Sequence, residues 1–324
     1  MKRLRSRWTV SLLLAALALC AYAWTLATPE IGGDVRLPPP SGDRLWSFGF
    51  VGDTQLGEGI VDVVFERFEK AEVDFVLHLG DIVDDASSCD QWKYVLGEAR
   101  RHHIRLRPVV GNHDRLVGTS DRGETRFREF FPDVPDTFYR FSHRGLEFVM
   151  LNSERSLLPW TQQGRFLNTV LGDLSDRSSD DTAIVCLHRP VFTCGRRDLA
   201  NQFLRRVWLH SRLLDTPARL VLSGHHHYYD RTKPLDGITY VVSGGGSHKL
   251  YPAADPDQTT AAFRAGVNHY GLVDVYADRL DVRVLDLDDQ ELDRFTVKRT
   301  RTATEGPPVS ALSAKKEDRA VVRR

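Results

Sequence analysis

The sequence predicts an α/β fold in which two mixed β-sheets stack against each other and helices flank them. In the first half of the chain, apolar runs of strand length alternate with amphipathic helical patterns, the βαβ order that gives parallel strands. From about residue 220 onward the pattern changes to short β segments without helices between them, which indicates a more antiparallel sheet. The chain has 324 residues, 41% of them hydrophobic, and can bury both sheets in one domain.

The folded region begins with a βαβαβ unit. We expect strands over residues 46–51, 75–79 and 105–110 and helices over residues 60–71 and 91–103. The first of these helices carries Val61, Val64 and Phe68 on one face, as its 3.6-residue period requires. Residues 115–137 form an insert with a helical centre.

The second half continues the alternation and then becomes β-rich. Strands 138–142 and 146–151 form a hairpin around Arg144 and Gly145. After it we expect helices over residues 162–171 and 199–214 and strands over residues 182–187, 220–223, 238–242, 272–276, 280–285 and 294–297. Residues 115–136, 157–164 and 252–267 are expected to be loops that set specificity.

The first 28 residues are predicted to direct export. Four basic residues within positions 1–7 precede an uncharged stretch from Trp8 to Thr28, about as long as the roughly 20 residues that cross a bilayer. Two alternatives stay open, a signal anchor that holds the chain in the membrane and a signal peptide cleaved after Ala23. In both, the remainder of the chain is expected outside the cytoplasm, in the cell envelope or secreted.

Composition also sets the domain boundaries. Residues 29–44 contain clusters of Pro and Gly and are expected to be an extended linker. Residues 45–298 form the folded domain, and residues 299–324 are polar and basic, as is typical of a disordered tail.

The charge distribution argues against a nucleic-acid partner. The formal net charge is zero, yet the N-terminus holds four basic residues and residues 298–324 hold a basic excess of five, which leaves an acidic excess of nine between them. An acidic body suits the binding of cations. The four cysteines, at positions 20, 89, 186 and 194, are too few for a disulfide scaffold, and a Cys89–Cys194 bridge and free thiols are equally open.

Polar residues follow five of the predicted strands at their carboxyl ends. The central one is Asp81, which comes directly after a buried strand and Gly80. In open α/β sheets this edge is where ligands bind. The other strand ends carry Asp53, the run Asn112-His113-Asp114, His188, and the run His225-His226-His227.

These side chains have the chemistry of a metal centre. Carboxylates, an amide and imidazoles without clustered cysteines form the ligand set of ions such as Mn, Fe and Zn. Six ligands exceed the need of one ion, and Asp81 at the centre can bridge two. Two ions about 3.5–4 Å apart generate a hydroxide and clamp both ends of an in-line phosphoryl displacement. The sequence therefore predicts a dinuclear-metal hydrolase of phosphate esters.

Five blocks in order and spacing resemble those of the calcineurin-like metallophosphoesterases. The blocks are Gly52-Asp53-Thr54-Gln55, Gly80-Asp81-Ile82-Val83-Asp84, Gly111-Asn112-His113-Asp114, His188 and Gly224-His225-His226-His227. The resemblance covers residues 46–286 and implies the four-layer sandwich of that family, which agrees with the strand pattern.

The resemblance also implies a role for each residue. Asp53, Asp81 and His227 would hold the first ion, with Gln55 beside them. Asp81, as the bridge, would hold the second ion together with Asn112, His188 and His225. His113, paired with Asp114, would stabilise or protonate the leaving oxygen, and Asn112 and His113 would contact the substrate. His226 points away from its neighbours if the segment is extended and is expected to support rather than ligate.

Two positions depart from relatives in the family. Most members have His where this chain has Gln55, and an amide is a weaker donor than imidazole. Bacterial diesterases of the family usually retain that His, so the resemblance favours a phosphomonoesterase. A phosphodiesterase and a non-catalytic metal-binding envelope protein remain the alternatives. Asp84 stands where the purple acid phosphatases have a tyrosine ligand, so no tyrosine-to-iron colour is expected.

Overall fold

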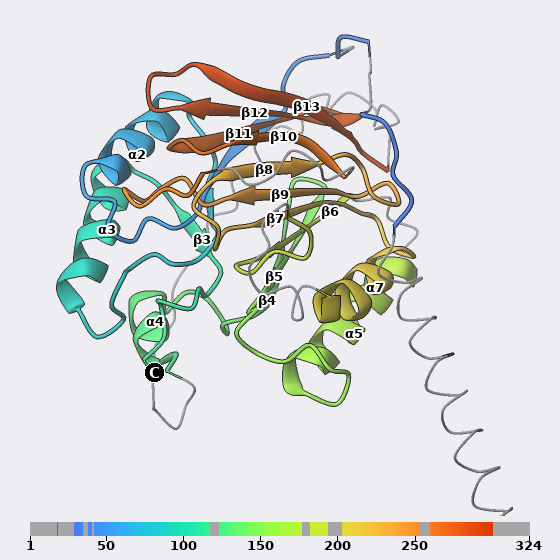
Figure 1. The fold of residues 1–324 in the computed structure, drawn as a ribbon, viewed down its shortest axis with the longest axis horizontal. Helices are drawn as coiled ribbons and strands as arrows, with labels where there is room; N and C mark the ends of the chain where they lie inside the picture. The colour runs from blue at the N-terminus through green and yellow to red at the C-terminus, as the bar shows by residue number, and fades with distance from the viewer. Residues whose placement is uncertain are drawn as a thin grey trace, which may run out of the picture.

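Two mixed β-sheets stack in the computed structural model, which describes residues 18, 29–34, 38–40, 42–116, 123–176, 182–193, 203–252 and 260–300 (Figure 1). The first sheet has six strands in the order β13-β12-β11-β1-β2-β3, and the second has seven in the order β10-β8-β9-β7-β6-β5-β4. The strands of the first sheet are β1 (Trp46–Val51), β2 (Val76–His78), β3 (Leu106–Pro108), β11 (His269–Val275), β12 (Arg279–Asp286) and β13 (Glu291–Lys298). Those of the second sheet are β4 (Tyr139–His143), β5 (Leu146–Leu151), β6 (Thr182–Leu187), β7 (Ala218–Ser223), β8 (Tyr229–Thr232), β9 (Thr239–Ser243) and β10 (Ala261–Ala265).

Each sheet has a parallel part and an antiparallel part. Strands β1, β2 and β3 run parallel, as the βαβαβ pattern predicts, and β11 to β13 extend the first sheet in antiparallel fashion. In the second sheet β5, β6, β7 and β9 are parallel, whereas β4, β8 and β10 are antiparallel. The predicted fold of two stacked mixed sheets is confirmed.

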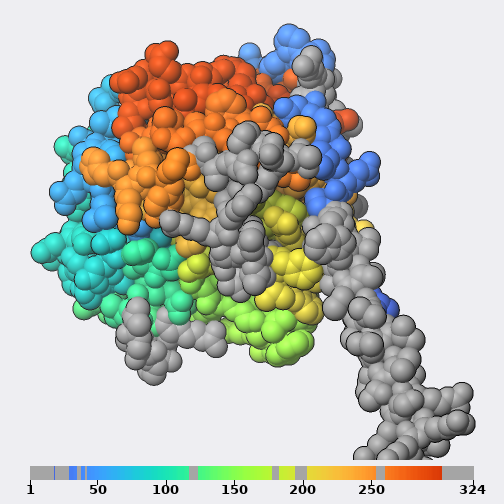
Figure 2. All heavy atoms as spheres, in the orientation of Figure 1, coloured from blue at the N-terminus to red at the C-terminus, as the bar shows by residue number. Residues whose placement is uncertain are grey.

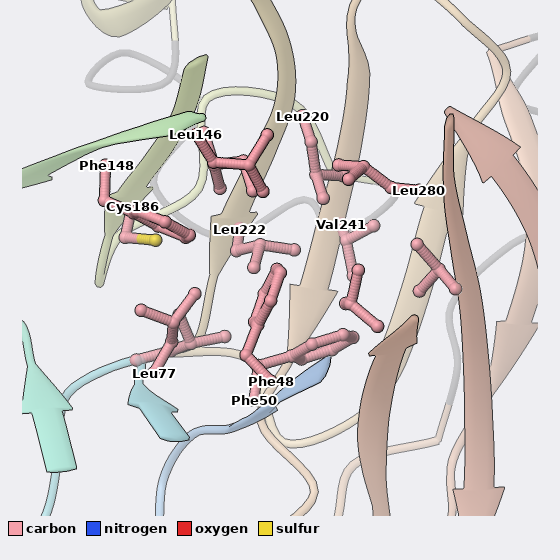
Figure 3. Close-up of a cluster of buried hydrophobic side chains, with 14 of the residues drawn as sticks. Phe48, Phe50, Leu77, Leu146, Phe148, Cys186, Leu220, Leu222, Val241 and Leu280 are labelled. Atoms are coloured by element: carbon pink, nitrogen blue, oxygen red, sulfur yellow. The ribbon is translucent and has the colours of Figure 1, made fainter. Parts of the chain in front are cut away.

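The main core lies between the sheets. Phe48 and Phe50 of β1 and Leu77 of β2 face Phe148 of β5 and Leu222 of β7 (Figure 3). The rings of Phe48 and Phe148 meet edge to face with centroids 5.5 Å apart, a favoured aromatic geometry. Because both sheets bury this layer, their strands are held at a fixed spacing, and the loops at their carboxyl ends share one rim.

Helices cover the outer faces of the two sheets. Helices α2 (Ile60–Lys70), α3 (Cys89–Arg101) and α4 (Thr125–Phe130) pack on the first sheet. On the second lie α5 (Gln162–Asp176), the π-helical turn η1 (Arg206–His210) and α7 (Ser211–Leu213). The space-filling view shows β11 to β13, in orange to red, along the top of the molecule and α2 and α3 at its left side (Figure 2).

Two strands, β8 and β10, were not expected from the sequence. The prediction placed β10 inside the loop at residues 252–267, because its residues show no alternation of apolar and polar side chains. The hydropathy of β8 does not predict a buried strand, because the strand buries a charged side chain. Its Arg231 pairs at 2.6 Å with Asp293 of β13, and both side chains are under 10% exposed.

Residues 31–34 of the N-terminal segment form hydrogen bonds with the folded domain. The backbone amide of Gly32 donates to the Pro234 carbonyl oxygen at 2.7 Å, and Ile31 forms a bridge with Leu235. The carboxylate of Asp34 also accepts from Arg231 at 2.8 Å. The first part of the segment predicted to be an extended linker over residues 29–44 therefore adds backbone pairing to the turn between β8 and β9.

Some predictions concern residues that the structure does not describe. The predicted export segment and the tail beyond Thr300 are among them, as is the start of the helix expected over residues 199–214. In the ranges that are described, no helix is both long enough and apolar enough to cross a membrane. Cys89 and Cys186 are free cysteines, which agrees with the free-thiol alternative, and Cys194 is outside the described residues.

A pair of glycine substitutions tests the packing of β1 against β11. A Cβ on Gly271 would lie 1.9 Å from the ring of Phe50, whereas a Cβ on Gly172 in α5 would meet no atom within 4 Å. We expect Gly271→Ala to lower the free energy of unfolding by about 1–3 kcal/mol through overpacking. Gly172→Ala, the control, should raise it by about 0.5–1 kcal/mol because alanine favours a helix. Urea denaturation measures the free energy of unfolding of both variants. A change in the same direction for the two variants would contradict the packing of Gly271 against Phe50.

Candidate metal centre

Loops from both sheets meet at the candidate site. The first sheet supplies Asp53 and Gln55 after β1, Asp81 after β2 and Asn112 after β3. The second sheet supplies His188 after β6 and His225 and His227 after β7. The structure thus brings all seven predicted ligands to the shared rim of the sandwich.

The backbone at three of these positions is in the left-handed region. Asp53, Asp81 and His225 have φ values of 60°, 51° and 70°. Non-glycine residues adopt this conformation at a cost of order 1–3 kcal/mol, and they persist only where surrounding contacts hold them. One such contact is the Asp53 amide, which donates to the Gly80 carbonyl at 2.9 Å. Gly111 belongs to the same arrangement, because a Cβ there would lie 2.2 Å from the Asp81 carboxylate.

One group of donors forms around Asp53. Its carboxylate is fully buried and lies 3.5 Å from Nε2 of His227. The amide nitrogen of Gln55 lies 3.2 Å from the same Nε2. His227 donates from Nδ1 to the Lys249 carbonyl oxygen at 2.5 Å, so the backbone fixes its ring with Nε2 toward Asp53 and Gln55.

A second group forms around Asp81. Nε2 of His188 lies 3.2 Å from the Asp81 carboxylate and 3.2 Å from the side-chain oxygen of Asn112. His188 donates from Nδ1 to the Leu79 carbonyl at 2.9 Å, which orients its ring as in His227. One ligand atom each from Asp81, His188 and His225 lies within 4.8 Å of the others.

The ionisable groups in these two clusters influence one another strongly. Burial raises the pKa of Asp53, and the nearby charge of Asp81 adds to that increase. Burial also opposes ionisation of Asp81, but the positive charge of His188 prevails and holds the pKa of Asp81 below its usual value. For His188, burial favours the neutral ring, yet Asp81 and Asp53 raise its pKa to about 10. A proton on His188 therefore supplies the positive charge that these carboxylates require.

The donor set fits two metal ions. The side-chain oxygen of Gln55 is buried without a hydrogen-bond partner among the described residues, although such an atom normally has one. Each of the two groups combines carboxylate, amide and imidazole donors. In the assignment that the resemblance implies, Asp53, Gln55, Asp81 and His227 would hold one ion, and Asp81, Asn112, His188 and His225 would hold the other.

His113 has a different partner from the one expected. Its Nδ1 donates to the Asp84 carbonyl oxygen at 2.8 Å and lies 3.5 Å from the Asp84 carboxylate. The ring is 39% exposed at the rim, so Nε2 is available to a bound molecule. Its backbone amide donates to Asp81 at 2.8 Å, which couples His113 to the centre.

Asp114 is a backbone-supporting residue rather than a partner of His113, which corrects the predicted pairing. Its fully buried carboxylate accepts from the amides of Ile82 and Gly111 at 2.8 Å each and of Val83 at 3.2 Å. Burial, assisted by the charge of Asp81, raises the pKa of Asp114 to about 7. These bonds tie the loop after β3 to the loop after β2 and so hold Asn112 near Asp81.

Two other histidines of the region, His226 and His78, bind neighbouring hydroxyl groups, and a supporting role was expected for His226. His226 lies 2.7 Å from the hydroxyl of Tyr228 through Nδ1, and His78 lies 2.9 Å from the hydroxyl of Thr54.

Two residues at the rim were not predicted from the sequence. Arg189 follows His188 directly, and Glu154 binds its guanidinium group in the structure. Only the position of Arg189 beside a ligand could have signalled it.

Open space flanks the centre on two sides. A cavity of about 620 Å³ borders Gln55 and is lined with Ile82, Val83 and Tyr94. Another of about 540 Å³ borders Asn112 and His113 and is lined with Asp84 and Arg115.

Together, the fold and these side chains define a two-sheet protein with a candidate metal centre. The family model described as calcineurin-like phosphoesterase matches residues 47–229. The chain belongs to the calcineurin-like phosphoesterase family.

Individual relatives are more distant. The chain is 24% identical over 258 residues to a phosphoenolpyruvate phosphatase of Allium cepa, an alignment that covers 73% of this chain and 52% of the relative. The chain thus spans about half the length of that curated relative. A purple acid phosphatase from Lupinus luteus has a similar structure, with a TM-score of 0.67 at 18% identity over 86% of this chain and 58% of the other. A dimetal phosphatase from Danio rerio gives a TM-score of 0.51 at 15% identity over 79% of this chain and 100% of the other. At these identities the structural likeness shows the fold alone.

Substitution of Asp81 tests whether its carboxylate bridges two metal ions. The wild-type protein should bind about two ions, and Asp81→Asn should lose both because the charge shared by the two groups is gone. Asp85→Asn is the control, since Asp85 is exposed and its carboxylate accepts hydrogen bonds from the amide and hydroxyl of Ser87. Elemental analysis of the purified proteins measures the metal content. Retention of one tightly bound ion by Asp81→Asn would contradict a bridging role.

Proposed function

We propose that this chain is a metal-dependent phosphoesterase that hydrolyses phosphate monoesters. The observation that carries the proposal is the buried Asp81 carboxylate, which lies 3.2 Å from Nε2 of His188 in a cluster with His225. Membership of the calcineurin-like phosphoesterase family and the phosphatase names of its relatives support the same reaction class. When bound, two ions supply Lewis acidity and a nucleophile at neutral pH. Mn, Fe and Zn all suit these donors.

The protein's own residues orient the phosphate and handle the proton of the leaving group. Asn112 and His113 lie together at the mouth of the cavity on that side of the centre. Because the Asp84 carbonyl binds Nδ1–H of His113, Nε2 is the ring atom that can give a proton to a leaving oxygen.

An assay on paired substrates tests the substrate class. The full chain loaded with Mn should hydrolyse p-nitrophenyl phosphate with a higher kcat/KM than bis(p-nitrophenyl) phosphate. A higher kcat/KM for the diester would contradict the proposed substrate class and indicate a phosphodiesterase. Protein that holds two ions and turns over neither ester would instead support the non-catalytic alternative.

Replacement of His113 tests its role as the acid. His113→Ala should keep its metal ions and lose kcat by roughly 10²-fold on alkyl phosphates, the usual size of a general-acid contribution. The loss should be smaller on p-nitrophenyl phosphate, because its leaving group needs no proton. The measurement is kcat for both substrates together with metal content. Equal losses on both leaving groups would assign His113 to phosphate binding instead.

We also propose that the domain lies outside the cytoplasm. The support is the basic start followed by the uncharged stretch from Trp8 to Thr28. Two reporters fused after Arg324, one active only in the cytoplasm and one only outside it, should give signal from the outside reporter alone. The same fusions without residues 1–28 serve as the control and should reverse the pattern. Cytoplasmic signal from the full chain would reject the proposed location.

A further inference from the structure

The described N-terminal residues are bonded to the turn between β8 and β9. The amide of Glu30 donates to the Asp236 carboxylate at 2.9 Å, and the Asp236 amide donates to the Glu30 carbonyl oxygen at 2.8 Å. The Gly32 amide donates to the Pro234 carbonyl oxygen at 2.7 Å. One residue separates Glu30 from Thr28, where the uncharged stretch ends, so chain length alone keeps that end within about 8 Å of Glu30. The uncharged stretch therefore joins the domain at this turn.

A basic cavity borders the same turn. Its volume is about 340 Å³, within the range of small-molecule sites, and its wall includes Pro234 and Gly237 of the turn. Three basic residues line it, Arg219 of β7 and Lys298 and Arg299 at the end of β13. Among the described residues that line this cavity, none is acidic. The cavity is therefore suited to an anion.

Two of the basic residues supply charge that no carboxylate offsets. Arg219 is half-buried, and its Nη1 donates to the carbonyl oxygens of Thr216 and Ala218 at 3.1 and 2.7 Å. These neutral acceptors orient the guanidinium and leave its charge in place. Neither Arg219 nor the exposed Lys298 forms an ion pair within the part of the chain that the structure describes, and burial alone lowers the pKa of Arg219. The carboxylate of Asp236, in the turn, accepts from the N-terminal segment instead.

The basic C-terminal segment begins at the same cavity. Thr300 lines the cavity, and its backbone amide donates to the Thr182 hydroxyl at 3.0 Å. Residues 301–324, which follow it, contain six basic and three acidic residues. An uncharged stretch of membrane-spanning length and a basic segment thus join the domain beside one basic cavity.

An anionic lipid headgroup fits this combination. Phosphate oxygens accept hydrogen bonds from an arginine fork, and lysine adds a compact positive charge. A membrane-embedded segment together with a basic patch gives stable anchoring, and each basic residue near an anionic membrane surface strengthens binding by about 5-fold. A zwitterionic headgroup carries its own positive charge and gains much less.

We propose that the cavity lined by Arg219 and Lys298 binds the phosphate of an anionic phospholipid headgroup, and that residues 1–28 are retained as the membrane anchor beside it. The turn between β8 and β9 then faces the bilayer. This inference goes beyond the proposed function, because it concerns a site that takes no part in hydrolysis. A free phosphate ion offers the same oxygen atoms, so it is compared directly with the lipid in the test.

Calorimetric titration of the full chain, metal-free and in a neutral detergent, tests the site. The probes are dihexanoyl phosphatidylglycerol, dihexanoyl phosphatidylcholine and inorganic phosphate. The anionic lipid should bind at least about 10-fold more tightly than the other two, because only it combines the charge with acyl chains. Its dissociation constant should rise about 5-fold in Lys298→Gln, which changes an exposed side chain, and about 25-fold in Arg219→Gln/Lys298→Gln.

A matched double variant is the control. Lys70→Gln/Lys93→Gln removes two exposed basic residues from α2 and α3 and should leave all three titrations unchanged. Equal binding of the two lipids, phosphate binding as tight as that of the anionic lipid, or wild-type affinity in Lys298→Gln and the double variant would each overturn the proposal. So would an intact mass showing that residues 1–23 have been removed. Ester hydrolysis is a separate measurement, so its absence would reject the proposed function and leave the lipid titrations to decide this site.

Discussion

The burial of Asp53 and Asp81 at one rim is the constraint on which the rest of the site depends. Both residues are at most 1% exposed, and the charge of Asp81 adds to the burial that disfavours ionisation of Asp53. Two negative charges withdrawn from water need compensating positive charge and hydrogen bonds close by. In the metal-free protein the proton on His188, the His225 amide and the His113 amide supply them. The same atoms are oriented so that cations can replace that proton.

The architecture makes this arrangement possible at a tolerable energetic cost. The layer of aromatic and aliphatic side chains between the sheets fixes the distance between strands of different sheets (Figure 3). Consequently, loops that are far apart in sequence meet with little freedom to relax. The left-handed backbone at Asp53, Asp81 and His225 is held by this frame. Asp114 completes it, because its three accepted amide bonds join two of the loops.

Much of the fold and the position of polar residues at the strand ends could be predicted because each depends on local patterns. Apolar runs followed by Gly-Asp, Gly-Asn or Gly-His marked both the strands and the residues at their ends. Features that depend on partners distant in sequence could not be read in this way. Strand β8 contains Arg231, which is buried because it pairs with Asp293, 62 residues away. A charged residue does not indicate a buried strand when the sequence is considered locally, so β8 was not predicted. Asp114 was assigned to its neighbour in sequence, although its acceptors are committed to backbone amides. The clamp of Glu154 on Arg189 spans 35 residues and has no local signature.

The central claim is that these donors hold two ions with Asp81 between them. Diffraction from crystals grown with Mn, recorded on both sides of the Mn absorption edge, tests it most directly. We expect two anomalous peaks about 3.5–4 Å apart, one beside Asp53 and His227 and the other beside His188 and His225, with the Asp81 carboxylate touching both. A single peak, or none with His188 still bonded to Asp81, would contradict the account.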